Sequence, residues 1–141
     1  MNTQTSPTCF VLMPYDGKSH EATIVKSLYE HLIKPEIIQA GFEALRADEL
    51  SPDFRFIDQI HLAIQKSALV IADLSGNNPN IMYEIGLAHA LRKPVILIST
   101  DVASVPVDLL GYLMLLYNPA RQEEFRQNLK RFLSRYAHAK T

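Results

Sequence analysis

Short apolar runs and segments with helical spacing alternate along the chain. The apolar runs predict strands at residues 9–13, 42–47, 68–73, 94–98 and 113–117. Apart from 42–47, these runs are continuously apolar up to their last residue, which is typical of strands buried on both faces of a parallel sheet.

Apolar residues at intervals of three or four positions predict the helices between these strands. The predicted helices cover about residues 19–40, 54–66, 80–91 and 125–136. Pro35 is expected to kink the first helix or divide it, because proline lacks a backbone donor and crowds the preceding turn. Gly41 suits the C-cap of that helix. Four residues of the second helix are expected to face the core: Ile57, Ile60, Leu62 and Ile64.

This alternation of strands and helices predicts a parallel sheet with helices on both of its faces. We expect an α/β fold with a flavodoxin-like three-layer sandwich, in which five parallel strands have the order 2-1-3-4-5. A chain of 141 residues is long enough to bury the core of one domain. The expected organisation is a loose lead-in over residues 1–8 and a single domain over residues 9–141.

Composition and charge exclude few functions. Hydrophobic residues make up 48% of the chain and charged residues 21%, as in ordinary globular proteins. The net charge of -1 gives no reason to expect a nucleic acid or an anionic membrane as a partner. No apolar run approaches the roughly 20 residues that span a bilayer, and the N-terminus lacks a signal-peptide pattern. We therefore expect a cytoplasmic protein in which the single cysteine, Cys9, is a buried and inert thiol.

Glu84 is the polar residue that most needs an explanation. It lies in a helical segment that is apolar at most other positions, just after a strand and a polar turn. With Asn80 as the N-cap, Glu84 falls in the first two turns, where the helix dipole favours a carboxylate. No basic residue lies three or four positions away to pair with it. Two interpretations stay open: a carboxylate placed for chemistry at the ligand-binding edge of the sheet, or a solvated glutamate that complements the dipole.

Other polar residues lie at the same predicted edge of the sheet. Asp73 ends the third strand and either faces the crevice or caps the following turn. Asp58 lies near the start of the second helix, where it either faces the crevice or complements the helix dipole at the surface. Tyr15 leaves the first strand at the level of a ligand and is a weak signal on its own. Residues 75–80 offer amides, a hydroxyl and backbone donors before a helix, which suits a ribose or a phosphate.

Motifs for a cofactor or a metal are lacking. Residues 75–80 have neither the spacing of a phosphate-binding loop nor that of a dinucleotide-binding Gly-x-Gly-x-x-Gly motif, so we expect no resident cofactor. No metal site is expected, because the five histidines show no metal-ligand spacing: His20, His31, His61, His89 and His138. The basic residues of the last helix fit a solvated helix face better than a nucleic-acid site: Arg126, Lys130, Arg131 and Arg135.

Five short segments of the chain carry motifs of a known protein family. The segments are Phe10–Tyr15, Arg46–Asp48, Ile71–Leu74, Asn78–Leu91 and Lys93–Val95. Together they resemble the nucleoside 2-deoxyribosyltransferase-like superfamily over roughly residues 9–117, with its bacterial TIR-like branch as the nearest match. The most specific part is the series Asn-Pro-Asn, Tyr-Glu-Ile-Gly and Lys-Pro-Val. The first turn departs from the pattern of true deoxyribosyltransferases, since Met-Pro-Tyr-Asp replaces their usual small-residue loop.

The resemblance implies cleavage or transfer of an N-glycosidic bond. It implies that Glu84 is the nucleophile that attacks the anomeric carbon and forms a glycosyl-enzyme intermediate. It further implies that Asp58 assists the departing base and that Asp73 orients the sugar or Glu84. The nucleophile must be ionised, which a helix start favours, whereas an acid for the leaving base needs an apolar setting and a raised pKa. The implied substrate-binding residues are Pro14, Tyr15, Asp16, Ser75, Gly76, Asn78, Asn80 and Tyr83.

The substrate stays open between a nucleoside, a nucleotide and NAD, because relatives in this superfamily include hydrolases of nucleoside monophosphates and TIR-type NAD-cleaving enzymes. Family enzymes often complete the site across a dimer, so a homodimer is expected. The alternative is a non-catalytic TIR-like module that binds a nucleotide signal or a protein partner and tolerates the loss of Glu84. A third reading is a plain flavodoxin-like interaction domain without a ligand.

Overall fold

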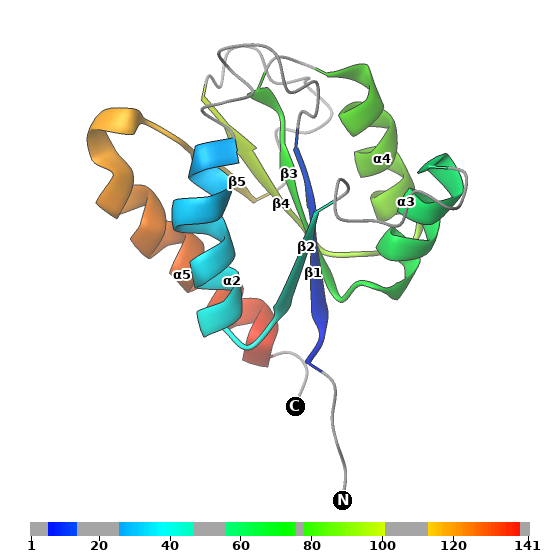
Figure 1. Cartoon of the computed structure of the whole chain (residues 1–141), viewed down its shortest axis with the longest axis horizontal. Helices are drawn as coiled ribbons and strands as arrows, with labels where there is room; N and C mark the ends of the chain where they lie inside the picture. The colour runs from blue at the N-terminus through cyan, green and yellow to red at the C-terminus, as the bar shows by residue number, and fades with distance from the viewer. Residues whose placement is uncertain (1–5, 14–25, 47–55, 76–77, 101–112, 139–141) are drawn as a thin grey trace, which may run out of the picture.

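Five parallel strands form one sheet at the centre of the molecule (Figure 1). The computed structural model describes residues 6–13, 26–46, 56–75, 78–100 and 113–138. The strands are β1 (Thr8–Leu12), β2 (Glu43–Arg46), β3 (Leu69–Asp73), β4 (Val95–Ser99) and β5 (Met114–Leu116). The order is β2-β1-β3-β4-β5 and every pairing is parallel, so the predicted sheet is confirmed.

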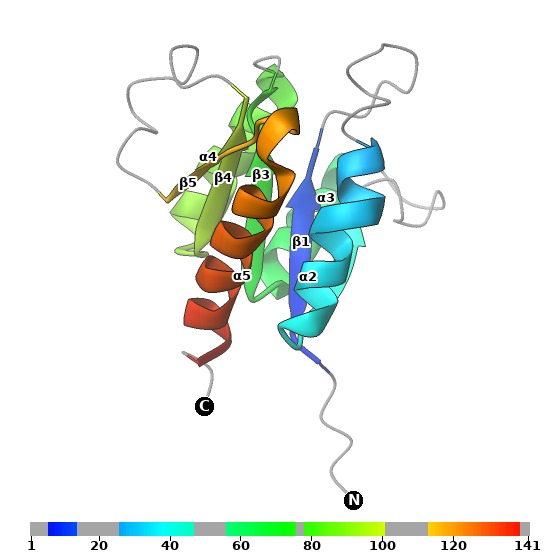
Figure 2. The same ribbon diagram turned by 90° about the vertical axis from the view of Figure 1, so that its left-hand side faces the viewer.

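Helices cover both faces of this sheet, as the alternating pattern predicts (Figure 2). On one face, a helical segment made of η1 (Tyr29–Ile33) and α2 (Lys34–Gln39) lies beside α5 (Gln122–His138). On the other face lie α3 (Phe56–Lys66) and α4 (Pro79–Ala90). A short 3-10 helix, η6 (Pro119–Arg121), leads into α5. None of the described helices is both long and apolar enough to cross a membrane.

Each face of the sheet has its own hydrophobic core, because successive side chains of a strand point to opposite faces. In β1, Cys9 and Val11 pack with the core under η1, α2 and α5, whereas Phe10 and Leu12 pack with the core under α3 and α4. β3 and β4 are buried along their whole length. This two-sided burial is the physical reason for the continuous apolar runs in the sequence, and it confirms that Cys9 is buried.

The irregularity predicted at Pro35 takes the form of a π-helical turn. The turn η1 immediately precedes α2, and the N–H of Lys34 donates to the carbonyl of Tyr29. Pro35 then lies in the first turn of α2, where an absent backbone donor costs least. The wider π turn accommodates the proline ring, and the chain stays helical through it to Gln39.

Gly41 ends this helix, as predicted. Its φ of 94° lies in the left-handed region that glycine adopts without a steric cost. The N–H of Gly41 donates to the carbonyl of Ile38 at 3.0 Å, and the N–H of Phe42 donates to that of Ile37 at 3.1 Å. This pair of bonds is a Schellman motif, which satisfies the last carbonyls of the helix and turns the chain into β2.

The expectation that Leu62 faces the core is wrong, since its side chain is 47% exposed. Ile60 and Ile64 lie on the buried side of α3. Leu62 is two residues from each of them, and a step of two residues turns an α-helix by about 200°, which directs Leu62 to the opposite side. The side chain of Ile57 lies outside the described residues.

Candidate functional site

The start of α4 is set by an asparagine cap. The side-chain oxygen of Asn78 accepts hydrogen bonds from the N–H groups of Asn80, at 2.9 Å, and Ile81, at 3.4 Å. Pro79 takes the first helical position, where its missing N–H is not needed. The expected cap at Asn80 is therefore wrong by two residues, because the proline lets the helix start directly after Asn78. Glu84 consequently lies in the second turn of α4.

Glu84 is 7% exposed and lies on the side of α4 that faces the sheet, together with Ile81, Ile85 and Ala88. Burial raises the pKa of its carboxyl from 4.5 to about 7, and no described hydrogen bond or charge opposes that shift. The dipole of a helix acts mainly on its first turn. The expectation that the helix start keeps Glu84 ionised is therefore wrong, because burial raises the pKa of this carboxyl more than the helix start lowers it.

This raised pKa predicts a pH-dependent gain of stability in the variant Glu84→Gln. A carboxyl whose pKa is higher in the folded state favours folding while it is protonated, and this contribution disappears as the pH rises through about 7. After allowance for solvent relaxation, the variant should be more stable than the wild type by about 1–2 kcal/mol at pH 8. Well below pH 5 the two proteins should be nearly equal, because the wild-type carboxyl is then neutral in both states.

Urea unfolding at the two pH values measures this difference, and any change in packing caused by the amide is common to both. A stability difference between the variant and the wild type that is the same at both pH values would contradict the assignment of an unfavourable buried charge to Glu84.

Asp73 ends β3 and caps the turn that follows it. It is buried, and its Oδ1 accepts a hydrogen bond from the N–H of Ser75 at 2.8 Å. Burial raises the pKa of Asp73, while hydrogen bonds from Ser75 oppose that rise to a smaller extent. The alternation of the strand gives Asp73 the same direction as Ile71, toward the face covered by η1, α2 and α5. Asp73 and Glu84 therefore reach the carboxyl edge of the sheet from opposite faces.

Asp58 lies in the first turn of the described α3, with an exposed side chain. Parallel strands with helical connections direct the starts of α3 and α4 to the same edge of the sheet, so Asp58 is on the side of Glu84. An acid that protonates a leaving base needs an apolar setting. Among the three predicted acids, Asp73 and Glu84 have that setting and Asp58 does not.

His61 lies in this region, although the sequence pattern did not assign it to the candidate site. Its ring lies 5.9 Å from the ring of Tyr83, measured between centroids, and this contact joins α3 to α4. The His61 Nε2 atom is buried and has no hydrogen-bond partner within the described part of the chain. Tyr83 is exposed and points away from the sheet. No local pattern signals this contact, because it joins residues of two separate helices.

The remaining predicted residues divide into two groups. Ser75 and Asn78 are engaged in the turn and the helix cap, and Asn80 is exposed beside them. Four predicted substrate-binding residues lie outside the described residues: Pro14, Tyr15, Asp16 and Gly76. In the described ranges no three His, Cys, Asp or Glu side chains come together as a metal site would need.

Neither a protein-family model nor a curated protein matches the chain, but solved structures do. A CMP N-glycosidase from Clostridium botulinum is similar with a TM-score of 0.62 and 21% identity, over 87% of this chain and 98% of that one. A 2-deoxyribosyltransferase from Bacillus psychrosaccharolyticus has a TM-score of 0.61 and 13% identity, over 83% and 90%. A 2-deoxyribosyltransferase from Leishmania mexicana has a TM-score of 0.52 and 19% identity, over 67% and 65%. These likenesses establish that the chain has the flavodoxin-like α/β fold of those enzymes.

Proposed function

We propose that the protein cleaves or transfers the N-glycosidic bond of a nucleoside or nucleotide, with Glu84 as the nucleophile. The observation that carries this proposal is the buried Glu84 carboxylate in the second turn of α4, without a described partner for its charge. Such a group is unfavourable for folding and is retained where it serves chemistry. The fold likeness to a CMP N-glycosidase and to 2-deoxyribosyltransferases supports the reaction class, and the Tyr-Glu-Ile-Gly motif supports the residue.

The reaction would proceed in two displacements. A carboxylate oxygen of Glu84 bonds to the anomeric carbon while the bond from that carbon to the base nitrogen breaks. The electron pair of the broken bond leaves with the base, which takes up a proton. Water then attacks the same carbon, releases the Glu84 carboxylate and gives up a proton, so that one base and one sugar result. If a second base attacks in place of water, the outcome is transfer.

The proton for the departing base is best supplied by Asp73. Its burial raises its pKa, which favours the protonated form that a general acid requires. Asp58 is exposed and is better suited to hold a polar group of the substrate at the flank of the site. The polar residues between Ser75 and Asn80 precede the α4 N-terminus, where a ribose hydroxyl or a phosphate would find donors.

The pH dependence of base release is predicted by the pKa of Glu84. Only the ionised Glu84 carboxylate attacks, so kcat/KM of Asp73→Asn, which has no titrating acid at that position, should rise about tenfold per pH unit below pH 7 and level off above about 7. Chromatography of released base between pH 5 and pH 9 measures this profile. A residual kcat/KM of Asp73→Asn that instead falls as the pH rises through about 7 would show that Glu84 acts in its protonated form and is not the nucleophile.

A substrate panel tests the reaction itself. CMP is named for one similar structure, deoxycytidine is a nucleoside with the 2-deoxyribosyl group that the others name, and NAD represents the TIR-like resemblance of the sequence. Release of free base from one of them supports the proposal and names the substrate class. If no base is released from any compound while one of them raises the melting temperature, the proposal fails and the chain is a binding module.

A further inference from the structure

A cavity of about 660 Å³ lies between β5, η6 and α5, away from Glu84. Small-molecule sites commonly measure about 300–1,000 Å³. The cavity borders the carboxyl ends of two strands, since Thr100 follows β4 and Tyr117 follows β5. The cavity therefore lies at the carboxyl edge of the sheet, beside the edge strand β5 and not at the point between β1 and β3 where the strand order reverses. None of the residues predicted for the Glu84 site lines this cavity.

The inner wall of the cavity is apolar and aromatic. The rings of Tyr117 and Phe125 meet edge to face, with centroids 5.3 Å apart and planes at 83°. Phe132 continues the wall along α5, and the exposed side chain of Leu116 borders it on β5. A wall of this kind favours a flat apolar group.

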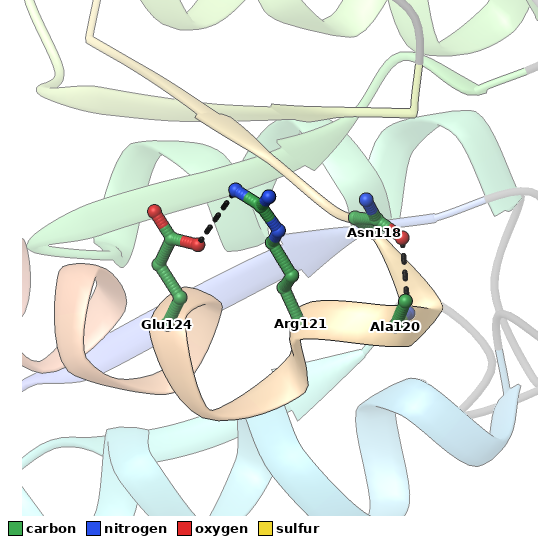
Figure 3. A network of polar contacts seen from close by, with 4 residues as sticks. All are labelled: Asn118, Ala120, Arg121 and Glu124. Carbon is green, nitrogen blue, oxygen red and sulfur yellow. Dashed lines mark hydrogen bonds and ion pairs between the residues drawn. The ribbon is translucent and has the colours of Figure 1, made fainter.

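The other wall is polar and carries an excess positive charge. Arg121 and Glu124 form an ion pair at 3.7 Å, and the side chain of Asn118 caps η6 through the N–H of Ala120 at 2.9 Å (Figure 3). The charges of Arg121 and Glu124 therefore neutralise each other. Arg131 also lines the cavity, and no described residue forms an ion pair with it.

Asn128 lies one turn before Arg131 on the same wall of α5. Its side-chain amide has no hydrogen bond to any described residue, so donors remain available beside the guanidinium. A guanidinium and a neighbouring amide form a favourable site for a carboxylate or a phosphate oxygen.

We propose that this cavity binds a small ligand with a planar aromatic ring and an anionic group. The ring would lie along Tyr117, Phe125 and Phe132, and the anionic group would be held by Arg131 and Asn128. This site goes beyond the proposed function and does not depend on Glu84. Two sources share the chemistry, a nucleotide and an aromatic carboxylate.

Binding to the full chain by titration calorimetry tests this proposal, with CMP, 4-hydroxybenzoate and uncharged cytidine as probes. Arg131→Gln should weaken binding of an anionic probe by about 10-fold or more, because it removes a charge-assisted hydrogen bond. Arg135→Gln is the matched control: Arg135 lies one turn further along α5 and does not line the cavity, so its loss should leave the affinity unchanged.

Amide chemical shifts locate the bound probe independently of any catalysis. Shifts caused by the anionic probe should concentrate at residues 114–132, and cytidine should not cause them. When the shifts lie at residues 114–132, tighter binding of CMP would identify a nucleotide site, and tighter binding of 4-hydroxybenzoate a site for aromatic acids. The proposal is overturned if neither anion binds at millimolar concentration, if both arginine variants bind equally, or if the shifts lie only on α4. Base release is not used, so failure of the Glu84 proposal leaves this test intact.

Discussion

Glu84→Gln is expected to lower kcat for base release by about 1,000-fold or more. The amide keeps nearly the same shape but cannot form the bond to the anomeric carbon, so the first displacement has no nucleophile. The fold should survive, because the substitution removes a buried group whose charge is unfavourable there. The measurement is single-turnover release of base from the substrate that the panel identifies.

Glu36→Gln provides a matched control for this experiment. Glu36 is 6% exposed, so it is buried to the same degree as Glu84, but it lies in α2 on the opposite face of the sheet. The same chemical change at this position should leave kcat within about twofold of the wild type. Equal rates in the wild type and Glu84→Gln would remove Glu84 as nucleophile, and a comparable loss in both variants would point to a general effect on folding.

Phe125→Ala is expected to lower the free energy of unfolding by about 3–5 kcal/mol. Phe125 is 2% exposed, lies edge-on to Tyr117 and packs α5 onto the core that also contains Leu115. Removal of the ring takes away buried apolar area and the edge-to-face contact with Tyr117, and it enlarges the neighbouring cavity. Urea unfolding should show a lower midpoint with an unchanged slope.

Phe132→Ala is the control for that loss. Phe132 lies on the same helix and is only partly buried against the same core. The same substitution should therefore cost clearly less, because less buried area is lost and solvent reaches the vacated space. Equal losses at the two positions would mean that Phe125 does not anchor α5 as its burial indicates.

The fold was predictable because its signals are local and agree with one another. Continuous apolar runs mark strands that are covered on both faces. Gly41 marks a helix end that requires a left-handed backbone conformation, which glycine adopts easily. The exact helix start was less predictable, since Asn78 and Asn80 are both good caps and Pro79 decides between them. The π turn before Pro35 has no comparable local signal.

The sequence singles out candidate residues for a site but does not predict their electrostatics. The sequence leaves Glu84 open between a functional carboxylate and a solvated one, because a pattern does not measure burial. The structure shows the burial, and with it the rise in pKa that the helix start does not offset. Arg131 was assigned to a solvated helix face, since its place beside β5 depends on how α5 packs against the sheet edge. His61 was missed for the same kind of reason, as its contact with Tyr83 joins two separate helices.

The register of the sheet also bears on how the chain folds. β1 must find β3 across a long intervening segment, since Cys9 pairs with Leu69. β3 and β4 are joined through α4 alone, and Val70 pairs with Val95. Closure of the shorter loop costs less entropy, so the β3–α4–β4 unit should form early and β1 should add to it later. The segment expected to nucleate the sheet therefore contains Glu84, whose buried charge is unfavourable. The low entropy cost of closing this short segment offsets part of that unfavourable free energy.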